Sequence, residues 1–179
     1  MTWIRPVGLF LLMTSTAACS SVKVGYDHDP SANFSAYHTF NWVPGPQEAT
    51  GDYRVDNSLV DIRIRTAIEA QLTLNGYSRP ANGDPDFYVA YHAGVKDIVK
   101  GSSAQYYKGD WAHGRYTTVS DIQPYKEGTL VVDIVDATSK QLVWRGSGLG
   151  EVDPSLDSQE RSERIRNVVR EMLSHFPPH

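Results

Sequence analysis

The chain has almost no cysteine, and this scarcity limits the ways in which it can be stabilised. Cys19 is the only cysteine among 179 residues, so an intramolecular disulfide is impossible. A structural zinc site needs several thiolates or histidines at short spacing, and none surrounds Cys19. A catalytic thiolate would normally lie inside the folded domain, close to a histidine. Packing must therefore hold the fold together, and Cys19 needs another explanation.

Long apolar segments and an excess of positive charge are also missing. The apolar run Val7–Met13 is too short to span a bilayer, and no later segment is longer and equally apolar. The formal net charge is −4. Because nucleic-acid binding normally requires a basic face, this balance argues against a nucleic-acid partner.

The residues before Cys19 follow the order of a secretory signal peptide. One positive charge lies within Met1–Arg5, the apolar run follows, and Thr16–Ala18 are small. Small residues directly before a cysteine resemble a bacterial lipobox, although Thr16 stands where leucine is usual. We therefore expect residues 1–18 to be a signal peptide, Cys19 to carry lipid, and residues 19–21 to form a short tether. The alternative is an ordinary signal peptide cut nearby, which leaves a free thiol.

Lipidation of Cys19 would also determine where the protein resides. Each buried methylene contributes about 0.8 kcal/mol, so several acyl chains anchor a domain almost irreversibly. Ser20, rather than aspartate, follows the cysteine, which by resemblance to Gram-negative lipoproteins implies sorting to the outer membrane. We expect an outer-membrane, lipid-anchored protein that faces the periplasm.

Residues 22–179 are expected to form a single α+β domain. Apolar residues at helical spacing predict one helix from Asp56 or Ser58 to Gly76 and another over 158–175. Strand-like segments occupy 22–26, 37–43, 86–95, 129–135 and 142–145. Because most strands are joined without a helical crossover, we predict a two-layer sandwich: a mostly antiparallel sheet with both amphipathic helices packed on one face.

Several stretches together resemble one known family. They are YDHDPSANFSAYHTFNW (26–42), RIRTAIEAQLTLNGY (63–77), PDFYVAYHAGV (85–95), GTLVVDIVDATSKQLVWRGSG (128–148) and the closing FPP (176–178). In these stretches the chain resembles the bacterial lipoprotein family known as domain of unknown function 4136. The resemblance implies an anchored envelope lipoprotein with one α+β domain. It provides no catalytic residues.

No arrangement of reactive side chains predicts catalysis. The six histidines form no HxH or HExxH motif, so no metal site is expected. His28, between two aspartates, is better explained as part of a solvated turn, and His92 as an exposed strand residue. Asp133 and Asp136 are expected on opposite strand faces, with Asp136 forming a turn.

Glycines at 146, 148 and 150 invite comparison with a phosphate-binding loop, but the spacing is incomplete and no helix start follows. Small residues here are expected to let another element pack closely against the strand.

An aromatic stretch between residues 101 and 125 is the best candidate for a contact surface. This region is rich in glycine, tyrosine and serine and has no helical period. Aromatic residues and arginine dominate binding hot spots, and aromatic rings also stack on sugars. The candidate residues are Tyr106, Tyr107, Trp111, His113, Arg115 and Tyr116. The alternative interpretation is a long edge hairpin whose rings pack on the sheet.

These observations favour a non-enzymatic lipoprotein that acts as a binding or assembly module in the cell envelope, without cofactor or metal. Its expected partners are the membrane, through lipid on Cys19, and an envelope protein or glycan. The alternative is a module that binds glycan, peptidoglycan or lipid through residues 106–116. A third interpretation, an envelope hydrolase, lacks a visible set of nucleophile and base.

Overall fold

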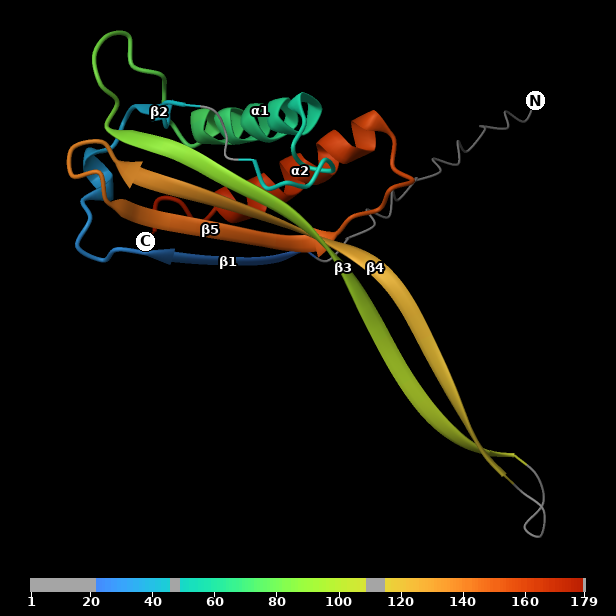
Figure 1. The fold of residues 1–179 in the computed structure, drawn as a ribbon. Helices are drawn as coiled ribbons and strands as arrows, with labels where there is room; N and C mark the ends of the chain where they lie inside the picture. Colours follow the sequence, from blue (N-terminus) through green and yellow to red (C-terminus); the bar gives the residue numbers. More distant parts are fainter. Residues whose placement is uncertain (1–21, 46–48, 109–114, 179) are drawn as a thin grey trace, which may run out of the picture.

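The fold is an α+β sandwich, as the sequence predicts (Figure 1). The computed structural model describes residues 22–45, 49–108 and 115–178; for residues 100–124 it describes backbone pairing only. The elements are β1 (Lys23–His28), the 3₁₀ turn η1 (Phe34–Ala36), β2 (Phe40–Trp42), α1 (Ser58–Leu74), β3 (Phe87–Lys108), β4 (Arg115–Asp136), β5 (Leu142–Glu151) and α2 (Ser158–Leu173). Among the described residues, no helix is long and apolar enough to span a membrane.

The five strands form a single mixed sheet in the order β1-β5-β4-β3-β2. Among the described strands only β2 and β3 pair in parallel, and α1 provides the crossover that a parallel connection requires. The turn between β4 and β5 is closed by Asp136, whose carboxylate accepts hydrogen bonds from the amides of Thr138 and Ser139 at 3.1 and 2.6 Å. This confirms Asp136 as a turn-forming residue.

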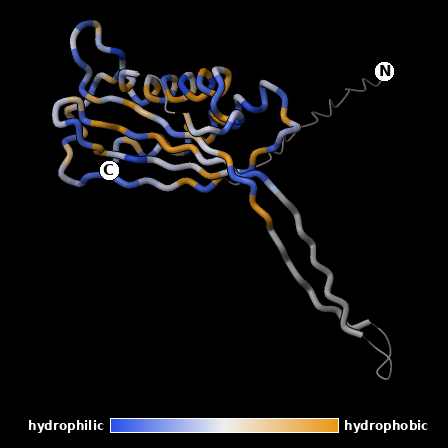
Figure 2. The backbone as a smooth tube through the Cα atoms, viewed as in Figure 1, coloured by the Kyte–Doolittle hydropathy of each residue, from blue (hydrophilic) through white to orange (hydrophobic). Residues whose placement is uncertain are grey.

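Both helices cover the same face of the sheet, and the core lies between the two layers (Figure 1). Phe87 of β3 is fully buried, and its ring centroid lies 5.2 Å from that of Tyr77 and 5.6 Å from that of Phe176. Figure 2 shows apolar positions recurring along both helices and along the strands of the sheet body. This burial of large side chains, at roughly 1.5–3 kcal/mol each, stabilises the fold without any disulfide.

Close packing of α2 against β5 explains the glycines at 146 and 148. A Cβ atom on Gly148 would lie 2.6 Å from Val168 Cγ1, and one on Gly146 would lie 2.5 Å from Met172 Cγ. Real Cβ atoms do not tolerate such distances, so any larger residue would force α2 away from the strand. The expectation that small residues permit close packing here is confirmed.

Strands β3 and β4 continue far beyond the rest of the sheet (Figure 1). They pair from Phe87↔Asp136 to Lys108↔Arg115, whereas β5 pairs with β4 only from Glu127 onward. Residues 98–108 and 115–125 therefore form a two-stranded ribbon, here called the hairpin arm. The predicted end of one strand at 95 and the predicted start of another at 129 were wrong, because the sequence between them shows no sustained alternation of apolar and polar residues.

Candidate functional site

The hairpin arm holds the predicted contact residues at its far end. Tyr106 and Tyr107 lie on β3, and the backbone register places Tyr107 opposite Tyr116 on β4. Arg115 is paired with Lys108 one step closer to the tip. Trp111 and His113 lie outside the described residues, as do the side chains of the other four. The hairpin interpretation of this stretch is confirmed for the backbone, but the hairpin leaves the sheet instead of lying along its edge (Figure 1).

The arm has two open edges. Within the described residues, neither of its strands has a second neighbouring strand. With eleven register pairs from Ile98↔Tyr125 to Lys108↔Arg115, the arm is roughly 35 Å long at about 3.3 Å per residue. An isolated two-stranded ribbon is marginally stable in water, and its free amides and carbonyls can pair with another strand. The arm is therefore suited to binding a partner by strand addition.

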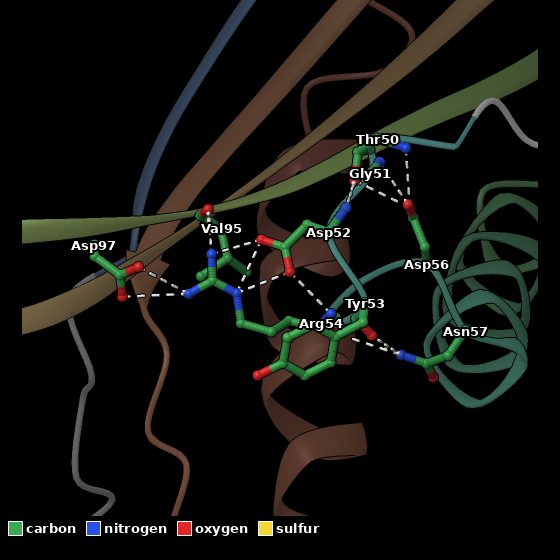
Figure 3. A network of polar contacts seen from close by, with 9 residues as sticks. All are labelled: Thr50, Gly51, Asp52, Tyr53, Arg54, Asp56, Asn57, Val95 and Asp97. Atoms are coloured by element: carbon green, nitrogen blue, oxygen red, sulfur yellow. Dashed lines mark hydrogen bonds and ion pairs between the residues drawn. The ribbon is translucent and has the colours of Figure 1, made fainter.

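Arg54 fixes the base of the arm to the body of the protein (Figure 3). Its guanidinium donates to both carboxylate oxygens of Asp52 at 2.5–2.9 Å and to the Val95 carbonyl at 3.0 Å. It also bonds Asp97 of β3 at 3.2 Å. Arg54 thus connects the loop before α1 to the point where β3 leaves the sheet.

The loop that carries Arg54 is itself ordered by hydrogen bonds (Figure 3). Asp56 accepts from the amides of Thr50 and Gly51 at 3.1 and 2.7 Å, and this lowers the pKa of its carboxyl group. The hydrogen bond from Arg54 likewise lowers the pKa of Asp52. Asn57 caps α1 by accepting from the Val60 amide at 3.1 Å. The carboxylates therefore stay charged near neutral pH and hold the loop in place.

A cavity of about 460 Å³ opens at this same end of the molecule. Its walls come from the first turns of α1 and α2 and from the sheet beneath them. Its apolar lining residues include Val60, Ile64, Ala93, Leu130, Ile165 and Val168. Most of them are only partly buried, although they pack against the core. The volume lies within the range of about 300–1,000 Å³ that is typical of small-molecule sites.

The basic side chains that line this cavity are half-buried or exposed, and together with the acidic lining residues they are here called its rim. They are Arg54, Arg63, Lys126, Arg161 and Arg164, and the acidic lining residues are Glu151 and Asp153. Within the described residues only Arg54 among these cations forms an ion pair. Arg63 instead donates to the Ser158 hydroxyl at 2.9 Å. The rim is thus positively charged, although the whole chain carries −4.

The polar residues that the sequence raised as possible metal ligands or catalytic groups form hydrogen bonds and ion pairs within the fold. Asp29, beside His28, accepts from the Ser31 hydroxyl and amide at 2.7 and 2.8 Å, and these bonds lower its pKa. Asp133 is buried and forms a bidentate pair with Arg145 at 2.6 and 2.7 Å. His92 is half exposed, and its Nε2 lies 3.8 Å from Asp133. Among the described residues, no three potential metal ligands come together.

A polar network between α1 and the edge of the sheet was missed in the sequence. Tyr91 donates to Asp61 at 2.6 Å, and burial together with this bond raises the pKa of the tyrosine. Trp42 donates its indole N–H to Glu69 at 2.6 Å, and Arg65 stacks 4.4 Å above the Trp42 ring. The pairs join residues far apart in the chain, so no local signal predicts them. They attach α1 to β2 and β3.

Comparison with solved structures gives distant matches. A PDZ domain protein from Parabacteroides distasonis ATCC 8503 matches with a TM-score of 0.56 and 13% identity, over 88% of this chain but 36% of that one. The chain thus spans about a third of that protein's length, and the likeness concerns the fold alone. Two PelC dodecamer structures from Paraburkholderia phytofirmans match with TM-scores of 0.47 at 11% and 10% identity, over 86% of this chain and 95% and 96% of theirs.

None of the curated proteins compared with the chain matches it. The family model described as Domain of unknown function (DUF4136) matches residues 24–178, which is nearly all of the described chain. The match spans the sheet, both helices and the hairpin arm, and agrees with the resemblance noted in the sequence. The chain therefore belongs to the DUF4136 family.

Proposed function

We propose that the protein is a non-enzymatic lipoprotein, anchored by lipid on Cys19 in the outer membrane and facing the periplasm. Residues 22–179 act as one α+β domain that binds or assembles with another component of the cell envelope. Residues 1–18 serve as the signal peptide and are removed. The order of charged, apolar and small residues before Cys19 supports the anchor.

The hairpin arm is the observation that carries the binding role. Its two strands remain in register for eleven pairs beyond the last contact with β5. This ribbon lies beyond the part of the sheet that β5 covers, and its open edges leave backbone donors and acceptors available. A partner that adds a strand would satisfy these groups and order the arm. We therefore place the contact on residues 98–108 and 115–125, where four of the six candidate contact residues lie.

In-cell photo-crosslinking tests this role directly. A photoreactive residue replaces Tyr107 near the tip of the arm, and a matched control replaces Arg166, which lies on the exposed side of α2 with a side chain 53% exposed. Crosslinked species from the full-length, anchored chain are then identified by mass spectrometry. We expect a discrete protein adduct at position 107 and none at position 166.

Two outcomes would contradict the assembly role. An adduct only to glycan or lipid at position 107 would favour the rival role, a ligand-binding module that uses residues 106–116. Capture at position 166 with none at position 107 would place the working surface on α2. Release of the protein from the membrane fraction by Cys19→Ala tests the anchor separately, since an unlipidated chain should no longer float with membranes.

A further inference from the structure

We propose that the cavity at the base of the hairpin arm binds one acyl chain of an anionic phospholipid, with the lipid head group on the basic rim. This site is distinct from the arm that carries the proposed binding role. It combines an apolar interior, an opening at the surface and four cations that form no close ion pair with a described residue. Each of these features matches a different part of an anionic amphiphile.

The interior of the cavity suits a single hydrocarbon chain. It is lined by Val60 and Ile64 from α1, by Ile165 and Val168 from α2, and by Ala93 and Leu130 from the sheet. The volume of about 460 Å³ is too small for a protein segment with its own fold and lies within the range of small-ligand sites. Ile64 and Leu130 belong to the buried core, whereas the other four apolar side chains are only partly buried.

The rim selects for negative charge. Arg63, Lys126, Arg161 and Arg164 line the cavity, and none of them forms an ion pair with a described residue. Asp153 and Glu151 are the acidic groups on the same rim. Asp153 accepts hydrogen bonds from the hydroxyl and amide of Ser155 at 2.6 and 2.9 Å, which lower its pKa, and the charges of Arg164 and Arg161 lower it further. Two carboxylates therefore offset the five cations of the rim only in part. Arginine binds phosphate through paired, charge-assisted hydrogen bonds, so a phosphate head group fits this rim.

The path of the chain favours a membrane lipid as the source. Gly150 lines the cavity, and a Cβ atom on it would lie 3.8 Å from Val22 Cγ2, at the start of the described chain. Cys19 precedes Val22 by three residues, a reach of about 10 Å when extended. This step rests on the proposed anchor: lipid on Cys19 would hold the cavity at the surface of the bilayer, where phospholipid chains are available.

Photolabelling in vesicles tests the site. The full-length chain is reconstituted into phosphatidylcholine vesicles that contain a small fraction of phosphatidylglycerol with a diazirine in one acyl chain. A parallel sample contains phosphatidylcholine with the same labelled chain. We expect labelled peptides from residues 60–64 and 165–168, with at least about fivefold more label from the anionic lipid. Flotation with the vesicles is scored separately, so failure of the anchor is distinguishable from failure of the site.

Matched variants make the test specific. Ile165→Trp fills the cavity and is expected to reduce cavity labelling about tenfold, whereas Arg166→Trp, one position along on the exposed face of α2, should leave it unchanged. The double variant Arg63→Gln and Arg164→Gln should bring labelling by the two lipids to equality. Circular dichroism and thermal unfolding verify that each variant folds.

The proposal is overturned by three results. Equal labelling of the wild-type cavity by both lipids would refute the proposal that the basic rim binds an anionic head group. Unchanged labelling in folded Ile165→Trp would place the acyl chain elsewhere. Labelling of the cavity by a photoreactive fatty acid, but not by phospholipid, would refute a membrane phospholipid as the source.

Discussion

Substitution of Gly146 tests how tightly α2 lies on the sheet. An alanine Cβ at this position would overlap the Trp144 ring and lie 2.5 Å from Met172 Cγ. Trp144 and Met172 are both fully buried, so neither can move aside without disturbing its neighbours. Overpacking of this kind costs about 1–3 kcal/mol. We expect Gly146→Ala to lower the free energy of unfolding by about 2 kcal/mol, which corresponds to roughly 4–8 °C in melting temperature for a chain of this size.

Gly94→Ala is the matched control. Gly94 also lies in a strand, and a Cβ atom there would have nothing within 4 Å. Alanine at such a position restricts the unfolded chain and stabilises by about 0.4–1 kcal/mol or has no effect. The assay is urea denaturation followed by tryptophan fluorescence, with equal slopes required for comparison. If the two variants differed by less than about 0.5 kcal/mol, the close approach of α2 to β5 would be refuted.

Two further predictions concern the polar contacts. Asp86 accepts from the amides of His38 and Thr39 at 2.9 and 2.8 Å, and its pKa is lowered although burial opposes the shift. A carboxylate whose pKa is lower in the folded state stabilises the fold above about pH 4, and this stabilisation is lost as the pH falls through the folded-state pKa. The urea midpoint of wild type should therefore exceed that of Asp86→Asn by less at pH 3 than at pH 7. A difference that stays constant over this range would contradict the prediction. Arg54→Ala should lower the free energy of unfolding only slightly, because ion pairs at the surface contribute little. It should nevertheless speed amide exchange in residues 49–57 and 95–97 while core amides keep their rates, and a uniform change in exchange would argue against a local role.

Both helices and the turn between β4 and β5 were predictable, because the caps, turn residues and apolar spacing that specify them lie close together in the sequence. The last helix begins at Ser158 as expected, behind the cap that Asp157 forms with Glu160, and the apolar period of α2 extends almost to its end. The turn after β4 was likewise predictable, because Asp136 accepts a hydrogen bond from the amide of Ser139, only three residues later. In these places the residues that determine the structure are neighbours in the sequence.

The arm and the cavity were less predictable for physical reasons. The sequence of the arm, rich in glycine and serine, lacks the regular alternation of apolar and polar residues by which a strand is predicted. The cavity and its rim depend on contacts across the chain, such as that between Arg54 and Asp97, which are 43 positions apart. The parallel pairing of β2 with β3 is equally non-local. The aromatic residues at 106–116 indicated where the far end of the arm lies in the sequence. They predicted neither the length of the arm nor the direction in which it leaves the sheet.

Shortening the arm provides the most direct test of its role as the contact element. A two-residue Asn-Gly turn replaces residues 101–122, joining Lys100 to Gln123, which are paired in the native register. The full-length anchored proteins are extracted in detergent, and their complexes are compared by native mass spectrometry alongside thermal unfolding. We predict an unchanged melting temperature and loss of the complex. Retention of the complex by the folded, shortened chain would contradict the account.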